Sequence, residues 1–278
     1  MKNKYSFKFG VIVLSLVLIA CSGGSADVGC PEIDGREINV VATTPMIGEF
    51  VSNVGGDNIN LTVLMPPEAD PHSYEPAPQD AGTIADADLV FYTGLMYEPS
   101  PLVELLENSV CGSEALAEVG ESVFPIEFKE GGHDDHDDHG EKGHDDHDEE
   151  GHDDHDDHGG HEGHGHGAYD PHFWFDPNRV VYASEFIESK LIELDPSNAA
   201  SYQAAGDTYA TELSSLTGQV SQLIGSIPSQ NRKLITTHES LGYLEAKFGL
   251  EVLSTIIPDL DSSNCLLYTS DAADDRLS

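Results

Sequence analysis

One segment of this chain cannot contribute to a packed core, and it divides the sequence into two parts. Residues 131–167 read GGHDDHDDHGEKGHDDHDEEGHDDHDDHGGHEGHGHG, which contains only Gly, His, Asp, Glu and one Lys. Such a tract has no apolar surface to offset the entropy of ordering, so we expect it to be disordered. Any fold must therefore form from the residues before and after it.

The same tract is rich in metal ligands. Neutral imidazole is the commonest protein ligand for zinc-type ions, and His spaced by two Asp brings nitrogen and carboxylate donors to one cation. Eleven Asp and four Glu against Lys142 give a local charge of −14, which concentrates cations. Solubility alone does not require His at every third position, so we interpret the tract as a weak metal-collecting segment; a solvated acidic linker is the alternative. Its histidines are His133, His136, His139, His144, His147, His152, His155, His158, His161, His164 and His166.

The charge of the whole chain excludes one class of partner. The formal net charge is −39 with only twelve Lys and Arg, and three of these, Lys2, Lys4 and Lys8, lie at the N-terminus. Nucleic-acid binding needs clustered Lys and Arg against the phosphates, so we expect no nucleic-acid partner.

The N-terminus has the pattern of an export signal. The three lysines precede an apolar run at residues 9–20, which is shorter than a membrane span of ~20 residues but suits a signal peptide. The run ends in LIAC, which resembles the bacterial lipobox. We therefore predict a signal peptide at 1–20, a lipid anchor on Cys21 and a flexible tether at 21–36, placing the protein at the cell envelope. An ordinary signal peptide with an incidental Cys is the alternative.

Export also implies an oxidising compartment, in which Cys30 and Cys111 can pair as a disulfide. The sequence leaves this pairing open, because it does not show whether the two Cα atoms lie within the required ~4.4–6.8 Å.

The segment before the tract alternates expected strands with short helices. We expect strands at 37–43, 59–65, 89–93 and 122–128, and helices at 45–54, from 79 and at 101–109. This alternation predicts a parallel α/β lobe over residues 37–130.

The segment after the tract begins with two helices. Residues 177–194 carry apolar side chains on one face, and Asp-Pro pairs precede this helix and the next one. The second helix has a stripe that we expect to face the core. It comprises Tyr202, Tyr209, Leu213, Leu216, Val220, Leu223 and Ile227.

A second α/β series follows, with strands at 233–237 and 251–257 around a helix at 243–248. Two strands are too few for an independently stable parallel lobe, so we expect the lobe at 196–264 to be incomplete. Residues 265–278 resemble translated adapter sequence and are interpreted as a non-native tail; a genuine unusual C-terminus is the alternative.

Only three histidines lie outside the tract. His72 follows the second expected strand, His238 follows the strand at 233–237, and His172 precedes the helix after the tract. Ligands of open α/β sheets bind beyond the carboxyl ends of strands. A single such His is more often a structural residue, but two of the three lie in a repeated Asp-Pro-His motif, which favours one shared site.

Four segments carry a resemblance to a known family. They are ADPHSYEPAPQD, DPHFWFDPNRV, ELDPSNAASYQ and TTHESLGYLEAKFGL. Over residues 37–260 the chain resembles the zinc-specific solute-binding lipoproteins of ABC metal importers, a cluster that also contains manganese-binding relatives. The resemblance implies two Rossmann-like α/β lobes with parallel sheets, joined by a long rigid helix at 177–194. One metal would lie in the interlobe cleft, beside the cleft segment at 168–195.

The resemblance also implies a ligand set: His72 from the first lobe, His172 from the junction and His238 from the second lobe. Manganese-preferring relatives commonly place a carboxylate at the third position, whereas an all-nitrogen set favours Zn²⁺ over Mn²⁺. The family's fourth position would come from a later part of the second lobe, and Glu68 or water could take its place; a Glu68 that is only solvated in its loop is the favoured alternative.

Acidic neighbours of these histidines, Asp70, Asp170 and Glu239, are candidates to orient the imidazoles through hydrogen bonds. Asp70 and Asp170 can equally be turn residues, because Asp-Pro commonly opens turns.

The resemblance implies a monomer that captures zinc and docks on a membrane permease. The chain contains no Walker-type phosphate-binding motif, so its ATPase would be a separate partner. A surface adhesin or zinc-buffering lipoprotein with the same site is the alternative. A zinc hydrolase is a weaker one: His238-Glu239 begins an H-E-x-x-H motif, but Gly242 stands where the second His should be.

Overall fold

The computed structural model describes residues 30, 33, 35–128 and 168–256. The expected signal peptide with Cys21, the His/Asp tract and the tail at 265–278 lie outside these residues. Within the described part of the chain, no helix has the length and apolar character needed to cross a membrane.

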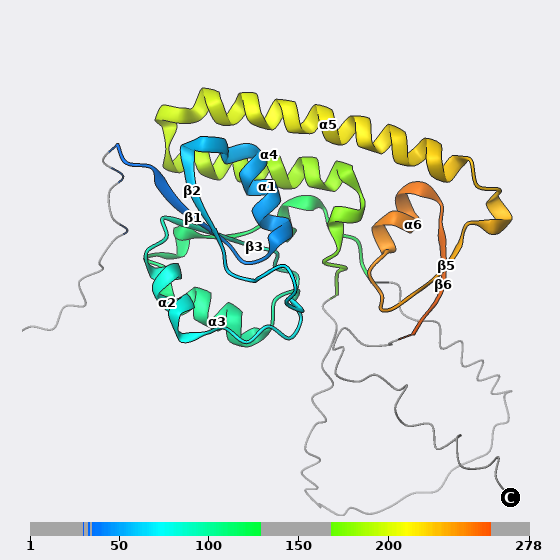
Figure 1. Cartoon of the computed structure of the whole chain (residues 1–278), viewed down its shortest axis with the longest axis horizontal. Coiled ribbons are helices and arrows are strands. Elements are labelled where there is room, and N and C mark those ends of the chain that lie inside the picture. The colour runs from blue at the N-terminus through cyan, green and yellow to red at the C-terminus, as the bar shows by residue number, and fades with distance from the viewer. Residues whose placement is uncertain (1–29, 31–32, 34, 129–167, 257–278) are drawn as a thin grey trace, which may run out of the picture.

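The first lobe is built on a four-stranded parallel sheet in the order β2-β1-β3-β4 (Figure 1). Parallel pairing brings the carboxyl ends of these strands to one edge, where ligand-binding loops of α/β proteins lie. The lobe's elements are β1 (Ile38–Ala42), α1 (Pro45–Gly55), β2 (Ile59–Val63), α2 (Pro78–Ala85), β3 (Leu89–Tyr92), α3 (Ser100–Ser109) and β4 (Leu116–Glu118).

Helices cover both faces of this sheet, because neighbouring strand residues point to opposite sides. Val40 belongs to a core cluster with residues of α1, whereas Val41 packs with residues of α2 and α3. The predicted parallel α/β lobe is therefore confirmed.

The fourth strand differs from the expectation. The strand predicted at 122–128 is wrong: β4 lies at Leu116–Glu118, and residues 120–123 form a 3-10 turn. Phe124 then takes a positive φ of 53°, which interrupts any extended strand. In residues 126–128 the one β-type pairing is an isolated antiparallel bridge between Glu127 and Tyr169.

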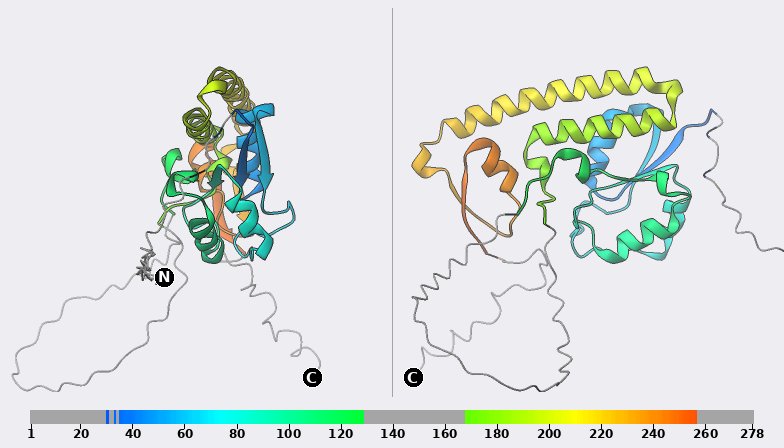
Figure 2. Two further views of the ribbon diagram at one scale, coloured as in Figure 1. Left: turned by 90° about the vertical axis from the view of Figure 1, so that its left-hand side faces the viewer. Right: turned by 180° about the vertical axis from the view of Figure 1, so that it is seen from behind.

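Two long helices follow, and the second one joins the lobes. Helix α4 (Pro177–Leu194) starts at the Asp176 cap, whose carboxylate accepts a hydrogen bond from the Asn178 amide. Its buried face packs into the core cluster of the first lobe. Helix α5 (Ala199–Gly225) runs back over α4 and reaches the second lobe (Figures 1 and 2).

The expectation that 177–194 bridges the lobes is thus wrong, because that helix buries its apolar face in the first lobe. At ~1.5 Å per residue, the 27 residues of α5 span ~40 Å, enough to extend over both lobes. The apolar stripe of α5 is also only partly buried. Tyr202 and Leu213 lie in the core, but Leu216 and Leu223 are 44% and 68% exposed.

The described part of the second lobe is smaller. It consists of β5 (Lys233–Thr236), α6 (Gly242–Phe248) and β6 (Glu251–Thr255), with the two strands parallel. Ile235 and Leu253, on the two strands, are both more than half exposed.

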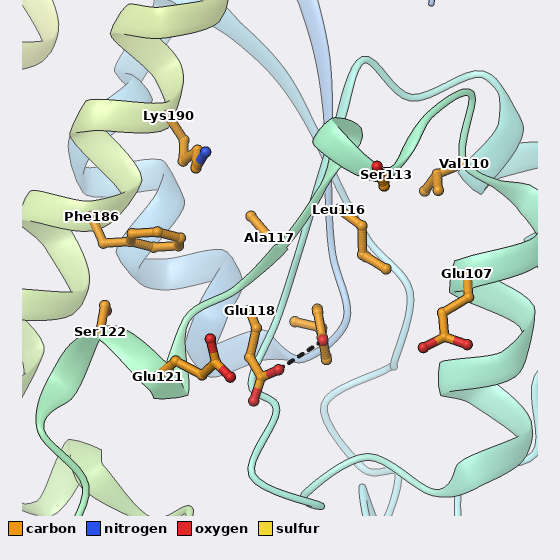
Figure 3. Close-up of a pocket in the computed structure, with 11 residues that line it drawn as sticks. Glu107, Val110, Ser113, Leu116, Ala117, Glu118, Glu121, Ser122, Phe186 and Lys190 are labelled. Carbon is orange, nitrogen blue, oxygen red and sulfur yellow. Dashed lines mark hydrogen bonds between the residues drawn. The ribbon is translucent and has the colours of Figure 1, made fainter.

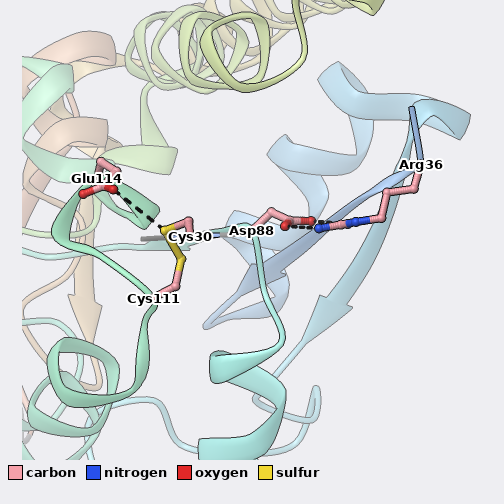
Figure 4. Close-up of a disulfide and its surroundings, with 5 residues drawn as sticks. All are labelled: Cys30, Arg36, Asp88, Cys111 and Glu114. Atoms are coloured by element: carbon pink, nitrogen blue, oxygen red, sulfur yellow. Dashed lines mark hydrogen bonds and ion pairs between the residues drawn. A yellow bond between two sulfur atoms is a disulfide. The ribbon is translucent and has the colours of Figure 1, made fainter. Parts of the chain in front are cut away.

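Two links tie the N-terminal segment to the first lobe (Figure 4). Cys30 and Cys111 form a disulfide with a Cα–Cα distance of 5.0 Å, joining the N-terminal segment to the residues after α3. The Arg36 guanidinium forms a two-pronged ion pair with the buried carboxylate of Asp88, which raises the pKa of Arg36. The Asp88 carboxylate also accepts a hydrogen bond from the Asn39 amide at 2.7 Å.

Candidate metal centre

His72 lies in the loop that follows β2. The Asp70 side chain accepts a hydrogen bond from the His72 amide at 3.1 Å, and the Ser73 amide donates to the Asp70 carbonyl. Asp70 therefore shapes the turn that presents the imidazole, as Asp-Pro turns commonly do.

His172 is the most buried of the three histidines, with 3% of its surface exposed. Its Nδ1 lies 2.8 Å from Asp170 Oδ1, and its amide donates to the same carboxylate oxygen. A carboxylate can only accept, so Nδ1 carries the proton and Nε2 presents its lone pair to the cleft. This is the carboxylate–histidine pairing that orients imidazole ligands toward metal ions.

His238 comes from the second lobe, directly after β5. Its backbone carbonyl accepts a hydrogen bond from the Thr236 hydroxyl at 2.7 Å, which fixes the turn at the strand end. Its Nε2 lies 3.4 Å from Nε2 of His172. Residues 66 positions apart in the sequence therefore meet through their imidazoles.

The three imidazoles converge on one point. One nitrogen from each of His72, His172 and His238 lies within 4.8 Å of the others. Two nitrogens bound to a tetrahedral zinc at ~2.0–2.1 Å lie about 3.4 Å apart. The His172–His238 spacing of 3.4 Å matches this value, and the nitrogen of His72 lies close enough to supply a third ligand.

Burial keeps two of these imidazoles neutral. The pKa of His72 is lowered to about 4, mainly by burial and then by the nearby His172 and His238. Burial and His172 also lower the pKa of His238. Because metals bind the neutral imidazole, these shifts leave both side chains ready to coordinate at neutral pH.

Aromatic rings enclose the site. The Tyr97 ring lies edge-on to His72, with 4.7 Å between ring centroids, and Trp174 lies 5.4 Å from His172. Tyr97 follows a turn in which two non-glycine residues, Leu95 and Met96, have positive φ. Tyr97 was not predicted from the sequence, because no local motif indicates where such a turn places the tyrosine ring. Trp174 was not predicted either, although it lies only two residues after the predicted ligand His172.

The other residues predicted for the site are Glu68 and the acidic neighbours of the histidines. Glu68 is exposed and is not among the described side chains that converge on the three imidazole nitrogens. The Asp170 carboxylate contacts the imidazole of His172, and the Asp70 carboxylate accepts a hydrogen bond from the His72 amide. Sequence reasoning also missed Tyr243, which contacts the backbone of Asp170.

A separate hollow of about 740 Å³ lies on the first lobe between α3 and α4 (Figure 3). Its carboxylates include Glu107, Glu118 and Glu121, but none of the three histidines lines it. Glu118 already accepts hydrogen bonds from the Tyr92 hydroxyl and the Leu95 amide. This hollow is therefore not part of the histidine centre.

Comparison with known proteins identifies the class. A family model described as "ZnuA: Zinc-uptake complex component A periplasmic" matches residues 40–264. This match covers most of the chain, so the protein belongs to that family and is the substrate-binding component of a metal ABC importer.

Two sequence relatives are both named for manganese. The chain is 25% identical to the manganese-binding lipoprotein MntA of Halalkalibacterium halodurans, over 90% of this chain and 70% of the relative. It is 28% identical to the manganese ABC transporter substrate-binding lipoprotein PsaA of Streptococcus anginosus, over 86% and 68%.

Among solved structures, a crystal structure of ZnuA shares the fold with a TM-score of 0.62 at 24% identity, covering 81% of this chain and 72% of that one. The periplasmic zinc-binding protein TroA of Treponema pallidum has the same TM-score and identity, over 79% and 66%. The α/β fold with a long helix is therefore confirmed.

Proposed function

We propose that this protein captures one Zn²⁺ at His72, His172 and His238 and delivers it to a membrane permease that a separate ATPase drives. The observation that carries the proposal is the convergence of three imidazoles from three parts of the chain, with the His172–His238 spacing suited to a tetrahedral ion.

The ligand chemistry favours zinc over manganese. All three converging donors are imidazole nitrogens, whereas Mn²⁺ prefers carboxylate, carbonyl and water oxygens. The metal named for a relative at 25–28% identity does not fix the metal of this chain. A fourth position filled by water would leave the ion exchangeable, as transport requires.

The remaining expectations complete this proposal. The His/Asp tract would load zinc weakly and exchange it with the cleft, and a lipid on Cys21 would hold the protein at the cell envelope. The tract can gather ions without competing for them, because a segment that must order upon binding binds more weakly than a pre-organised site.

Replacing His238 by alanine tests the proposal. We expect zinc binding at the tight site to weaken by more than ~100-fold, because even the loss of a group that only supports a ligand costs ~10–100-fold. Competition with a chelator of known affinity measures the change. His133→Ala, which removes one tract histidine, is the matched control and should leave the tight site unchanged.

The metal preference is tested with a different variant. His238→Asp adds a carboxylate to the site, so Mn²⁺ affinity should rise relative to Zn²⁺ affinity.

Tight zinc binding that survives in a folded His238→Ala protein would contradict the three-histidine site. Growth on limiting zinc then tests delivery to the permease.

A further inference from the structure

Tyr243, on α6 of the second lobe, makes a buried contact with the junction between the lobes. Only 2% of its surface is exposed, and it belongs to the same core cluster as residues of β1 and α4. Its hydroxyl donates a hydrogen bond to the Asp170 carbonyl at 2.8 Å and accepts one from the Ile126 amide at 3.2 Å. Burial raises the pKa of Tyr243 to about 12, so the hydroxyl keeps the proton that it donates.

This hydroxyl closes a small network that joins three segments. The Asp170 amide donates to the Ile126 carbonyl at 2.9 Å, so these two residues already pair with each other. Tyr243 bonds to both of them at once. One side chain of the second lobe thus holds the two chain segments that meet at the isolated bridge between Glu127 and Tyr169.

The contact between Tyr243 and Asp170 is linked to two of the candidate metal ligands, His172 and His238. Asp170 holds Nδ1 of His172 through its carboxylate, and His238 lies five residues before Tyr243 in the same segment. The fit around Asp170 is tight, because a Cβ atom placed on Gly242 would lie 2.7 Å from Asp170 Oδ2. Glycine at this position lets α6 approach the carboxylate.

We infer that Tyr243 is a positioning residue for the metal centre: its hydroxyl fixes the second lobe against Asp170 and so sets His238 beside His172. The inference rests on the function proposed above. Without the hydroxyl, the three histidines remain, but the segment that carries His238 loses the two hydrogen bonds that Tyr243 makes with Ile126 and Asp170.

The test compares Tyr243→Phe with Tyr202→Phe in the full chain. Tyr202 is also fully buried and donates a hydrogen bond from its hydroxyl to Asp195 at 2.9 Å. It belongs to the first turn of α5, whereas α6 lies near the opposite end of that helix (Figure 1). Each protein is loaded with one equivalent of Zn²⁺, and the slow phase of its release to an excess of chelator is recorded. Visible absorption of the Co²⁺-loaded protein reports the ligand geometry.

We expect Tyr243→Phe to release zinc about 10–100-fold faster than the unmodified chain and to change the intensity of the Co²⁺ bands. Tyr202→Phe should lower the melting temperature but keep the original release rate and spectrum. An unchanged release rate in Tyr243→Phe, or equal acceleration in both variants, overturns the inference.

Two further variants separate the remaining outcomes. If Tyr243→Phe does not fold, Gly242→Ala keeps the hydroxyl but displaces α6 from Asp170; it should also release zinc faster, and an unchanged rate overturns the inference. His238→Ala must abolish the slow phase. If it does not, the proposed function fails; if it does while Tyr243→Phe behaves like the unmodified chain, only the positioning role fails.

Discussion

The two lobes supply ligands to one metal centre, but their β-sheets differ in how deeply they are buried. In the first lobe, β1 and β3 are almost completely buried between two layers of helices. In the second lobe, β5 and β6 consist only of exposed and half-buried residues. The side chain of Tyr243, the most buried described residue of the second lobe, packs in the core cluster of the first.

This difference shows where the precision of the site originates. His72 and His172 are fixed by a lobe with its own core, whereas His238 depends on contacts that its lobe makes with the junction. These contacts include the Tyr243 hydrogen bonds and the ion pair between Lys247 and Asp176, at 3.6 Å.

The largest expected effect is on the free energy of unfolding, and it should differ between substitutions in the two lobes. Leu106, on α3, is completely buried, whereas Leu253, on β6, is 52% exposed. Leu106→Ala should lower the free energy of unfolding by about 2–5 kcal/mol through lost burial and the resulting cavity. Leu253→Ala should change it by only ~0.5 kcal/mol, as surface substitutions usually do.

Denaturant titration of the metal-free proteins measures both changes. Equal losses for the two variants would mean that the lobes are equally well packed, which would remove the basis of the comparison.

A smaller effect concerns pH. The folded pKa of His72 is about 4, against an ordinary value of ~6.5 in the unfolded chain, so protons favour unfolding. Stability of the metal-free protein that depends on His72 is present above pH ~6.5 and is lost as the pH falls toward about 4. The slope for one proton is at most about 1.4 kcal/mol per pH unit.

His72→Gln should remove more of this slope than His238→Gln, because burial and the neighbouring imidazoles lower the pKa of His72 to about 4 and the better packed lobe holds it there. Unfolding free energies at several pH values between 4 and 7 provide the measurement. An unchanged slope in His72→Gln would show that this imidazole is not held neutral by the fold.

Much of the fold follows from local sequence signals. Alternating apolar runs located β1, β2 and β3, and Asp176-Pro177 located the start of α4, because caps and buried strands are determined by neighbouring residues. The strand β4 was missed, since Leu116–Glu118 has only three residues and its pairing with β3 is a long-range contact.

The linking helix and the surroundings of the site also depend on long-range contacts. An apolar stripe shows that α5 is a helix, but it does not show which of its residues extend beyond the first lobe. The three candidate ligands could be predicted from the sequence, because they are the only histidines outside a low-complexity tract. Tyr97 and Tyr243 could not be predicted in this way, because their contacts depend on where a strained turn and the second lobe place their side chains.

The central claim is that His72, His172 and His238 bind one zinc ion together. X-ray absorption at the zinc edge tests it most directly, using one equivalent of Zn²⁺ on protein that lacks residues 132–167, so that tract histidines cannot contribute. We expect a four-coordinate ion with three imidazole nitrogens at ~2.0–2.1 Å, and loss of one imidazole contribution in His238→Ala. A spectrum with fewer than three imidazoles, or one that His238→Ala leaves unchanged, would contradict the account.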